Sequence, residues 1–292
     1  YEISACLVGS EMCIRDSNNV NLAQWRRDDA KVWHFLTEAK RLAFEDLARY
    51  YADPAFSEIP TSELLSEDYG KKRFDLINPE SATASFEPGK FSFRSRGDTT
   101  YLTVADSSGM MVSLIQSNYR GMGSGLVPDG LGFMLQDRGE LFSLEPSHPN
   151  VYKPGKRPFH TIIPAFIMQN ELPLMSFGIM GGTMQPQGHV QILINMFDYG
   201  MNPQEAGDAA RMNHIGGRRP TGGGDGDLLG VLHLEPGVSQ ETIKKLEDMG
   251  HRVEVVKDGV MFGGYQAIYK DQKTGVYIGA TEMRKDGLAI GY

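Results

Sequence analysis

The sequence predicts an α+β protein in which antiparallel sheets are covered by helices. Three pairs of segments with alternating apolar and polar residues flank short polar turns, which is the pattern of β-hairpins. Longer segments with apolar residues at helical spacing lie before, between and after these pairs. Hairpins interspersed with amphipathic helices are typical of a layered α+β fold.

The composition is that of an ordinary globular protein. The chain has 292 residues, of which 40% are hydrophobic and 23% charged, enough for one large or two modest domains. A net charge of −8 argues against a nucleic-acid partner or an anionic membrane surface. No apolar run is long enough to predict a membrane span.

The first residues need separate treatment. Leu7–Asp16 is the translation of a DNA sequence that resembles the adapter of transposase-based sequencing libraries. We interpret residues 1–17 as an artefact of cloning or assembly and exclude them from fold reasoning. Both cysteines, Cys6 and Cys13, lie there, so disulfide and thiolate chemistry is not expected in the remainder. The natural N-terminus is expected to be missing, which leaves the compartment unknown.

Helices are predicted where apolar residues recur every three or four positions. In the first of them Val32, Leu36 and Leu47 share one face, with Arg41 and Glu45 on another. Polar caps, prolines and glycines set the helix ends. The predicted helices span 30–51, 62–76, 186–199, 203–211 and 239–250.

Strands are predicted where the apolar period changes to two. The turns at 106–109, 169–171 and 270–275 each join two such segments into a hairpin. The paired segments are 100–105 with 110–117, 161–168 with 172–179, and 265–269 with 276–280, and single strands are predicted over 131–136, 228–234 and 253–256.

The junction between Asp98 and Thr99 is a candidate cleavage site. A polar run over 78–97, with the composition of a flexible connector, ends where the first hairpin begins. Cleavage of the Asp98–Thr99 bond would give Thr99 a free α-amine, which titrates near ~8 and can activate the threonine hydroxyl. The alternative is that Thr99 only opens a strand, and the junction alone favours this alternative because threonine is common in strands.

Gly181 and Gly182 form a second candidate feature. They follow a predicted strand and precede a predicted helix, where successive backbone N–H groups can bind an oxyanion. The alternative is a plain strand-to-helix turn, and the pattern alone does not decide between them.

Other motifs are weak. Gly121-x-Gly123-x-Gly125 has the wrong spacing for a dinucleotide fingerprint, and the seven histidines show no metal-ligand spacing. The chain also lacks a Gly-x-Ser-x-Gly elbow. No cofactor and no metal are therefore expected.

Taken together, these pieces resemble the γ-glutamyltranspeptidases (glutathione hydrolases), self-cleaving members of the N-terminal-nucleophile hydrolases. The likeness follows the family's order over residues 32–292. It runs through Glu38–Phe44, Asp98-Thr99-Thr100, Gly123-Ser124-Gly125, Arg157-Pro158, Pro164, Gly181-Gly182, Asp198-Tyr199-Gly200 and Gly287–Tyr292.

The resemblance implies a fold and a division of the chain. The family has a four-layer αββα sandwich, here incomplete at its N-terminus. Residues 18–98 then correspond to the C-terminal part of a large subunit, and residues 99–292 to a whole small subunit. The two subunits form a heterodimer after self-cleavage, and the missing large-subunit region is an expected partner. We expect the fragment alone to be unstable or inactive.

The resemblance also implies roles for individual residues. Thr99 matches the nucleophile, and the bond between Asp98 and Thr99 matches the cleavage site. Ser117 falls where the family has a threonine that hydrogen-bonds the nucleophile. Gly181 and Gly182 match the pair that forms the oxyanion hole.

The matched substrate-binding positions depart from the family. Tyr119 stands where the family has an asparagine, and His160-Thr161 replaces a pair of serines at the substrate carboxylate. Arg138 and Leu141 replace the glutamine and aspartate that hold the glutamyl amino group. Leucine cannot accept a hydrogen bond from an ammonium group, and losing a polar partner changes selectivity strongly. We hypothesise that Arg138 binds a carboxylate of a different acyl group.

The predicted function is therefore that of an amide hydrolase and acyltransferase that uses Thr99. Its substrate is a small γ-glutamyl amide, such as glutathione, or a related acyl amide. Two alternatives stay open: a glutaryl- or cephalosporin-type acylase of the same fold, and a descendant that no longer cleaves itself.

Overall fold

The computed structural model describes residues 2–4, 8–86, 98–222 and 227–292. The predicted connector over 78–97 and loop over 216–224 lie partly outside them. The helices are α1 (Val8–Ser17), α2 (Ala30–Tyr50), α3 (Thr61–Leu64), α4 (Glu67–Phe74), α5 (Met184–Phe197), α6 (Pro203–Asp208) and α7 (Gln240–Asp248). The strands are β1 (Glu2–Ser4), β2 (Asp98–Ala105), β3 (Met111–Tyr119), β4 (Ala165–Gln169), β5 (Leu172–Met180), β6 (Met212–Ile215), β7 (Val231–Leu234), β8 (Val253–Val255), β9 (Gly264–Lys270) and β10 (Tyr277–Thr281).

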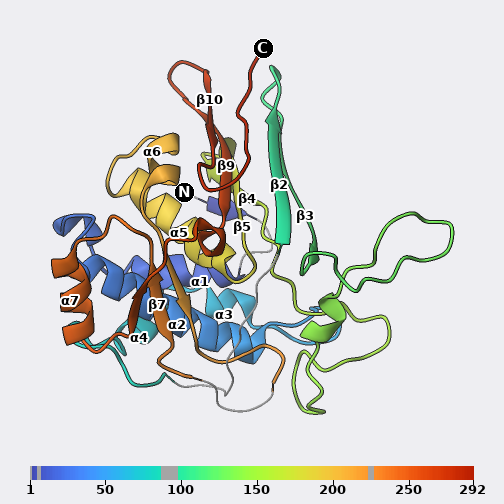
Figure 1. The fold of residues 1–292 in the computed structure, drawn as a ribbon, viewed down its shortest axis with the longest axis horizontal. Coiled ribbons are helices and arrows are strands. Elements are labelled where there is room, and N and C mark those ends of the chain that lie inside the picture. The colour runs from blue at the N-terminus through green and yellow to red at the C-terminus, as the bar shows by residue number, and fades with distance from the viewer. Residues whose placement is uncertain (1, 5–7, 87–97, 223–226) are drawn as a thin grey trace.

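The largest sheet has five antiparallel strands in the order β1-β4-β5-β9-β10. Two of the predicted hairpins, β4–β5 and β9–β10, form most of it. The third predicted hairpin, β2–β3, makes a separate two-stranded sheet beside it (Figure 1). The described chain therefore has a mixed α/β architecture, as the sequence predicts.

Strand β5 of the large sheet lies between helix α5 and the β2–β3 hairpin and contacts both. Its alternate residues Phe177 and Ile179 face α5: the Phe177 ring lies 4.9 Å from the ring of His189, and a Cβ on Gly188 of the same helix would press against Ile179. The residues between them face β2. Because Gly178 has no side chain, the Tyr101 ring lies directly over it. Helix α5, the large sheet and the β2–β3 hairpin are thus stacked in that order.

Helix α2 is buried on nearly every side, including the positions away from its predicted apolar face. Arg41 and Glu45 are both buried. Arg41 is compensated by Glu38, whose Oε1 is 2.6 Å from Arg41 Nη1, and Glu45 Oε2 is 3.0 Å from Arg218 Nη1. Burial of charged groups requires such partners. Glu38 and Arg41 are one helical turn apart, whereas Arg218 reaches Glu45 from 173 positions along the chain.

A third sheet, with the strand order β6-β7-β8, contacts α2 through β6. Strand β6 pairs with β7 antiparallel, and β7 pairs with β8 parallel. Strand β6 has no counterpart among the sequence predictions, because its partner β7 begins sixteen positions after β6 ends and no turn signal links the two.

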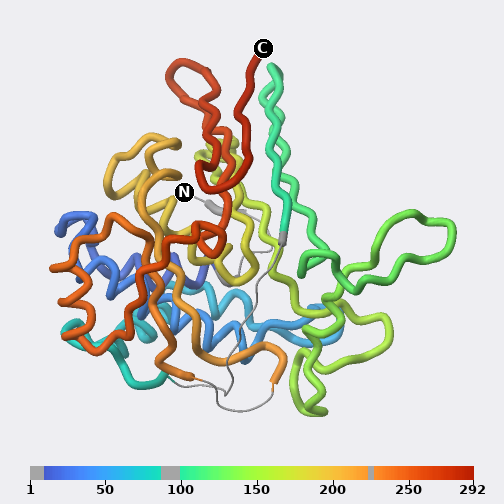
Figure 2. The backbone as a smooth tube through the Cα atoms, in the orientation of Figure 1, coloured from blue at the N-terminus to red at the C-terminus, as the bar shows by residue number. Residues whose placement is uncertain are grey.

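Several element bounds differ from the predictions for local reasons. The predicted strand over 131–136 is absent, and this segment belongs to a long excursion between β3 and β4 (Figure 2). Strand β4 begins only after Pro164, since proline has no N–H for the ladder. The predicted helix over 62–76 breaks at Ser66, whose hydroxyl accepts from Tyr69 N and caps α4.

The segment 8–17, which we excluded from fold reasoning, forms helix α1. This helix lies against α2 and α5, with Met12 and Cys13 buried. Cys13 is a free thiol in the described part of the chain.

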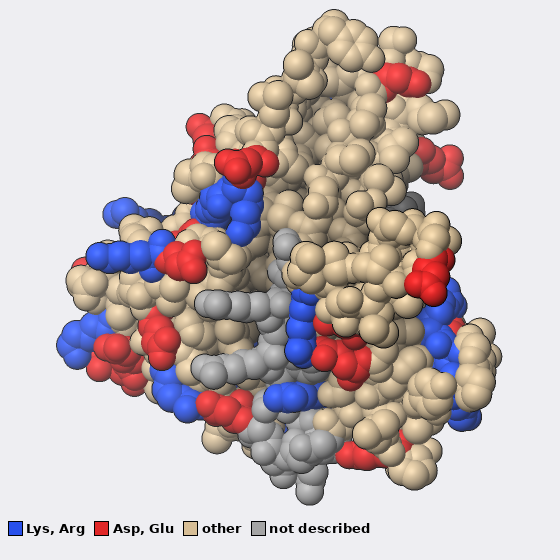
Figure 3. Space-filling view, turned by 45° about the vertical axis from the view of Figure 1, so that its right-hand side comes forward, with Lys and Arg blue, Asp and Glu red and all other residues tan. Residues whose placement is uncertain are grey.

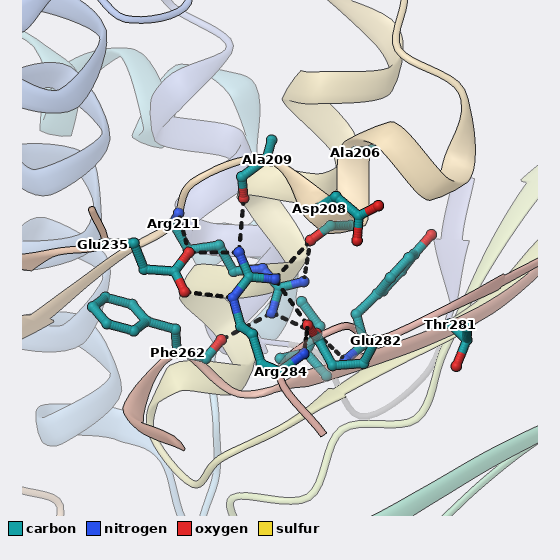
Figure 4. A network of polar contacts seen from close by, with 12 residues as sticks. Ala206, Asp208, Ala209, Arg211, Glu235, Phe262, Thr281, Glu282 and Arg284 are labelled. Atoms are coloured by element: carbon teal, nitrogen blue, oxygen red, sulfur yellow. Dashed lines mark hydrogen bonds and ion pairs between the residues drawn. The ribbon is translucent and has the colours of Figure 1, made fainter. Parts of the chain in front are cut away.

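A buried ion network fastens the C-terminal segment to α6 and to the ends of β7 and β9 (Figure 4). Arg284 pairs with Glu235 and lies 2.8 Å from Glu282 Oε1, while Arg211 Nη1 lies 2.9 Å from Glu282 Oε2. Arg284 also donates to the carbonyl oxygens of Gly207 and Ala209 at the end of α6. The side chains of all four charged residues are less than a tenth exposed.

Replacing Arg284 by Met tests this network. The change leaves the Glu235 carboxylate buried without its cation, and breaking a buried ion network in this way costs about 3–5 kcal/mol. We expect urea unfolding to show a loss of this size. The control Lys244→Met removes an exposed pair with Asp248 and should cost less than about 1 kcal/mol. Equal losses in the two variants would contradict a stabilising role for the network.

Candidate active site

Thr99 is the second residue of β2 and is 6% exposed. Its Oγ1 donates to Ser117 Oγ at 3.2 Å, and Ser117 Oγ accepts from Tyr119 N at 2.8 Å. The structure therefore brings together two of the residues that the sequence predicts as catalytic, through neighbouring strands of one hairpin.

A β-bulge makes this contact possible. Asp98 pairs with Tyr119 and Thr100 pairs with Gln116, so two residues of β3, Ser117 and Asn118, lie opposite Thr99 alone. Bulges of this kind redirect side chains and are common beside active sites. The chain leaves the bulge at Tyr119 with φ of 80°, a conformation that is unusual for an aromatic residue and typical of strained functional positions.

Gly181 and Gly182 form the turn from β5 into α5 with φ of 121° and 61°. Their carbonyl groups accept from Met184 N and Gln185 N in the first turn of the helix. Within the described part of the chain, neither glycine N–H has a hydrogen-bond partner. Two free N–H groups at the positive end of a helix are suited to bind a negatively charged oxygen.

The packing of β2 on β5 sets the level of Thr99 relative to these glycines. Tyr101 lies over Gly178, and the Thr103 hydroxyl bonds to the Ser176 hydroxyl. The two strands therefore run in opposite directions, so that a step of two residues toward the start of β2 matches a step of two residues toward the end of β5. Continued by two residues, this register would bring Thr99 level with Met180, the residue before Gly181.

A cavity of about 870 Å³ opens at the glycine turn. It is lined by both glycines and by three predicted substrate-binding residues, namely Tyr119, His160 and Thr161. Thr99 and Ser117 are not among the residues that line the cavity. The Asp98 side chain lies outside the described part of the structure.

Arg138 lies behind this wall and is only 2% exposed. It opens a short 3₁₀ helix (Arg138–Leu141) whose last residue, Leu141, is also buried. Arg138 Nη1 donates to Thr161 Oγ1 at 2.9 Å, and its guanidinium lies 5.0 Å from the centre of the Tyr119 ring. Burial lowers the pKa of Arg138.

His160 presents a neutral imidazole at the cavity. Its Nδ1 lies 2.9 Å from Pro158 O and must carry the proton to donate there, which leaves Nε2 as an acceptor. Burial and, to a lesser degree, the charge of Arg138 lower the pKa of His160.

Sequence reasoning missed Lys40 and His214, which form the opposite wall of the cavity. Lys40 Nζ donates to His214 Nδ1 at 3.0 Å and to Gly216 O at 3.2 Å. His214 Nε2 donates to Leu229 O, which fixes the imidazole tautomer that can accept from Lys40. The available signal was the position of Lys40 in the family-like segment 38–44, but a lone lysine in a helix does not indicate a cavity.

In the ranges that the structure describes, no cluster of three histidine, cysteine or acidic side chains could hold a metal ion. No described helix is both long enough and apolar enough to cross a bilayer.

The chain is similar to known proteins over nearly all of its length. The family model of gamma-glutamyltranspeptidase matches residues 5–292, a match that begins within the segment whose artefactual origin stays a prediction. The glutathione hydrolase-like YwrD proenzyme of Bacillus subtilis is 36% identical over 94% of this chain and 50% of its own length. The oxamate amidohydrolase proenzyme of Klebsiella pneumoniae is 35% identical over 91% of this chain and 48% of its own.

The crystal structure of cephalosporin acylase from Bacillus halodurans superposes with a TM-score of 0.83 at 38% identity, over 98% of this chain and 49% of that one. The fold is therefore of the class shared by γ-glutamyltranspeptidases and related acylases. The chain belongs to the γ-glutamyltranspeptidase family, as the sequence predicts, and spans about half the length of these relatives.

The buried amine of Lys40 gives a test of the cavity. Burial lowers the pKa of Lys40 from 10.5 to about 7. Between these values the unfolded chain binds the proton and the folded chain does not, so this lysine makes stability rise with pH by about 1.4 kcal/mol per unit. We expect Lys40→Met to remove this slope in unfolding free energies measured from pH 7 to 10.

The matched control is Lys244→Met, which removes an exposed lysine of α7 and should leave the slope unchanged. Parallel stability curves for the wild type and Lys40→Met would show that the amine is not buried as described.

Proposed function

We propose that this chain carries the nucleophile and oxyanion hole of a self-cleaving amide hydrolase and acyltransferase. The observation that carries this proposal is the register between β2 and β5. Tyr101 lies over Gly178 and Thr103 bonds to Ser176, and continuing this register supports a position of the Thr99 hydroxyl, which donates to Ser117, beside the two free glycine N–H groups. A nucleophile beside preorganised donors for a negatively charged oxygen is the arrangement that acyl transfer requires.

In the proposed maturation step, Thr99 Oγ1 attacks the carbonyl carbon of Asp98. The carbon–nitrogen bond of this peptide breaks as the acyl group moves from nitrogen to oxygen, and the Thr99 nitrogen takes the hydroxyl proton. Water then hydrolyses the ester, which leaves the Asp98 carboxylate on one piece and a free α-amine on Thr99.

The same attack then serves catalysis. The α-amine of Thr99 accepts the hydroxyl proton as Oγ1 adds to the substrate amide carbonyl. The N–H groups of Gly181 and Gly182 stabilise the resulting oxyanion, and the amine passes the proton to the departing nitrogen. Water or an acceptor amine releases the acyl group. Ser117 orients the nucleophile through its hydroxyl group.

We further propose that the active protein includes a preceding segment equivalent to the first half of its relatives. The described chain supplies the α, β and β layers, and an outer helical layer on β2–β3 would complete the αββα sandwich. Large apolar side chains on the uncovered face of this hairpin are 43–54% exposed, namely Leu102, Val104, Val112 and Leu114. Charged side chains are sparse over the upper part of the molecule in Figure 3, where the hairpins and the C-terminal segment lie. Uncovered apolar surface of this kind marks an interface.

Glutathione or another γ-glutamyl amide is the first candidate substrate, because relatives in the family are named glutathione hydrolases. A second candidate is an amide of another acyl group, such as a glutaryl or cephalosporin-type amide. Leu141 stands where the family has a residue that binds the ammonium group of the substrate, and this favours the second class. The names of the Bacillus halodurans and Klebsiella pneumoniae relatives agree with it.

A denaturing gel of the full-length protein tests the mechanism. The wild type should give two bands, one of which is the piece that begins at Thr99. Thr99→Ala should give one uncut band and amide hydrolysis reduced by at least about a thousandfold, since the nucleophile is lost. Thr99→Ser keeps the hydroxyl and should still cleave.

An uncut wild type without amidase activity would instead identify a non-catalytic descendant that serves as a binding domain. Full hydrolysis by an uncut Thr99→Ala protein would refute the role of Thr99.

A further inference from the structure

Two glutamines on α5 take the place of a neighbouring strand for β6. Gln187 and Gln191 lie one helical turn apart, and both are buried. The side chain of Gln191 accepts from Met212 N at 2.8 Å and donates to Met212 O at 3.0 Å. The side chain of Gln187 makes the same pair of bonds with His214, at 2.8 and 3.2 Å. Each amide therefore exchanges both bonds with one backbone residue, as opposite residues of two antiparallel strands do.

The spacing of the helix matches the spacing of the strand. Four residues of an α-helix rise about 6 Å along its axis, and two residues of a strand cover about 6.6 Å. Successive glutamines of α5 therefore meet alternate residues of β6. The other edge of β6 pairs with β7, so the two amides satisfy the edge that faces the helix.

Gln187 also reaches the glycine turn. Its Nε2 donates to Thr183 O at 3.2 Å and to Asn213 Oδ1 at 3.1 Å in addition to β6, so its two hydrogens are shared among three acceptors. Thr183 directly follows the two glycines. Gln191 makes the corresponding bond to Gln187 O, which lies inside the helix and one turn farther from the glycines. The two glutamines thus hold β6 alike, but only Gln187 holds the peptide that follows the turn.

Asn213 extends this contact to the other side of the glycine turn. Its Nδ2 donates to Met261 O at 2.8 Å, in the short 3₁₀ helix that Gly263 follows. A Cβ on Gly181 would lie 3.2 Å from the Cα of Gly263, so this segment packs directly against the turn. Gln187 therefore contacts the backbone after the glycines itself and the backbone behind them through Asn213.

The two glycines need such support, because a residue without a side chain adopts many backbone conformations. An oxyanion hole stabilises the transition state only if its N–H groups are already oriented when the negative charge forms. Resting on the proposed function, we infer that Gln187 is the positioning residue of this site and holds the Gly181–Gly182 turn in the orientation that binds the oxyanion. Gln187 is not among the residues that line the cavity, so it acts without touching the substrate.

The kinetic test compares Gln187→Met with Gln191→Met in the full-length protein. Both changes nearly preserve side-chain volume and remove two bonds to β6, so a purely structural role predicts equal effects. The substrate is γ-glutamyl p-nitroanilide, or glutaryl p-nitroanilide if the wild type hydrolyses it faster. We expect kcat to fall at least about tenfold more in Gln187→Met, with KM changed less than about threefold, because the oxyanion exists only in the transition state. Equal losses of kcat, or a loss confined to KM, would overturn the inference.

Asn213→Ala gives a second test that does not depend on the folding of Gln187→Met. The change removes the links to Gln187 and Met261 but leaves the bonds of both glutamines to the β6 backbone in place. Asn213 lines the cavity, so a role in substrate contact would raise KM, whereas the inferred role lowers kcat. An unchanged kcat would contradict the inference.

Hydrogen exchange tests the inference without catalysis. The first two amides of α5, Met184 N and Gln185 N, donate to the carbonyl groups of the two glycines, so their exchange reports opening of the turn. In the uncut Thr99→Ala protein, adding Gln187→Met should speed this exchange at least about tenfold, and adding Gln191→Met should not. Equal exchange in the two double variants would refute the inference. A wild type that neither cleaves itself nor hydrolyses amides would refute only the proposed function.

Discussion

The contact between β2 and β5 is the constraint on which the rest of this structure depends. Gly178 and Ser176 are small, so the hairpin approaches the large sheet closely, and Tyr101 and Thr103 fix the sliding position of one strand against the other. A larger residue at position 178 would overlap the Tyr101 ring. Because the glycine turn continues β5 and Thr99 begins β2, this single contact determines whether the two meet.

The large sheet is also closely packed on its opposite face, against α5. Its residues facing α5 are apolar and closely packed, and His189 is held among them as a neutral imidazole that accepts from Ile179 N. Burial lowers the pKa of His189 to about 3. Groups that must be placed accurately are better held by such elements than by loops. The glycine turn follows β5 of this sheet, and Thr99 lies in the β2–β3 hairpin that packs against it.

Local signals allowed much of the fold to be predicted. Asp106–Gly109 gave the β2–β3 hairpin, and Ser239 with Gly250 gave the limits of α7, because turns and caps depend on adjacent residues. Residues 131–136 alternate like a strand. In the structure only the backbone of Leu135 bonds to a facing segment, at Ser124 and Leu126, and the described chain forms no strand there, which alternation cannot reveal. Likewise, the burial of Glu45 in α2 could not be predicted, because its partner Arg218 lies 173 positions along the chain.

The candidate site could likewise be predicted only in part. Thr99, Ser117 and the two glycines could be proposed from matching motifs, and the structure brings them to one end of the molecule, although their roles remain proposals. Lys40 and His214 could not be found, since a hydrogen bond between positions 174 apart leaves no local pattern.

The bulge opposite Thr99 has a consequence for how this hairpin can diverge among relatives. Strand pairing is fixed at the end that carries Ser117, so residues added to or removed from the distant turn at 106–109 need not disturb it. An insertion or deletion at 117–118, in contrast, would rotate every following side chain to the opposite face. Length variation should therefore accumulate at the tip of the hairpin and be absent from its base.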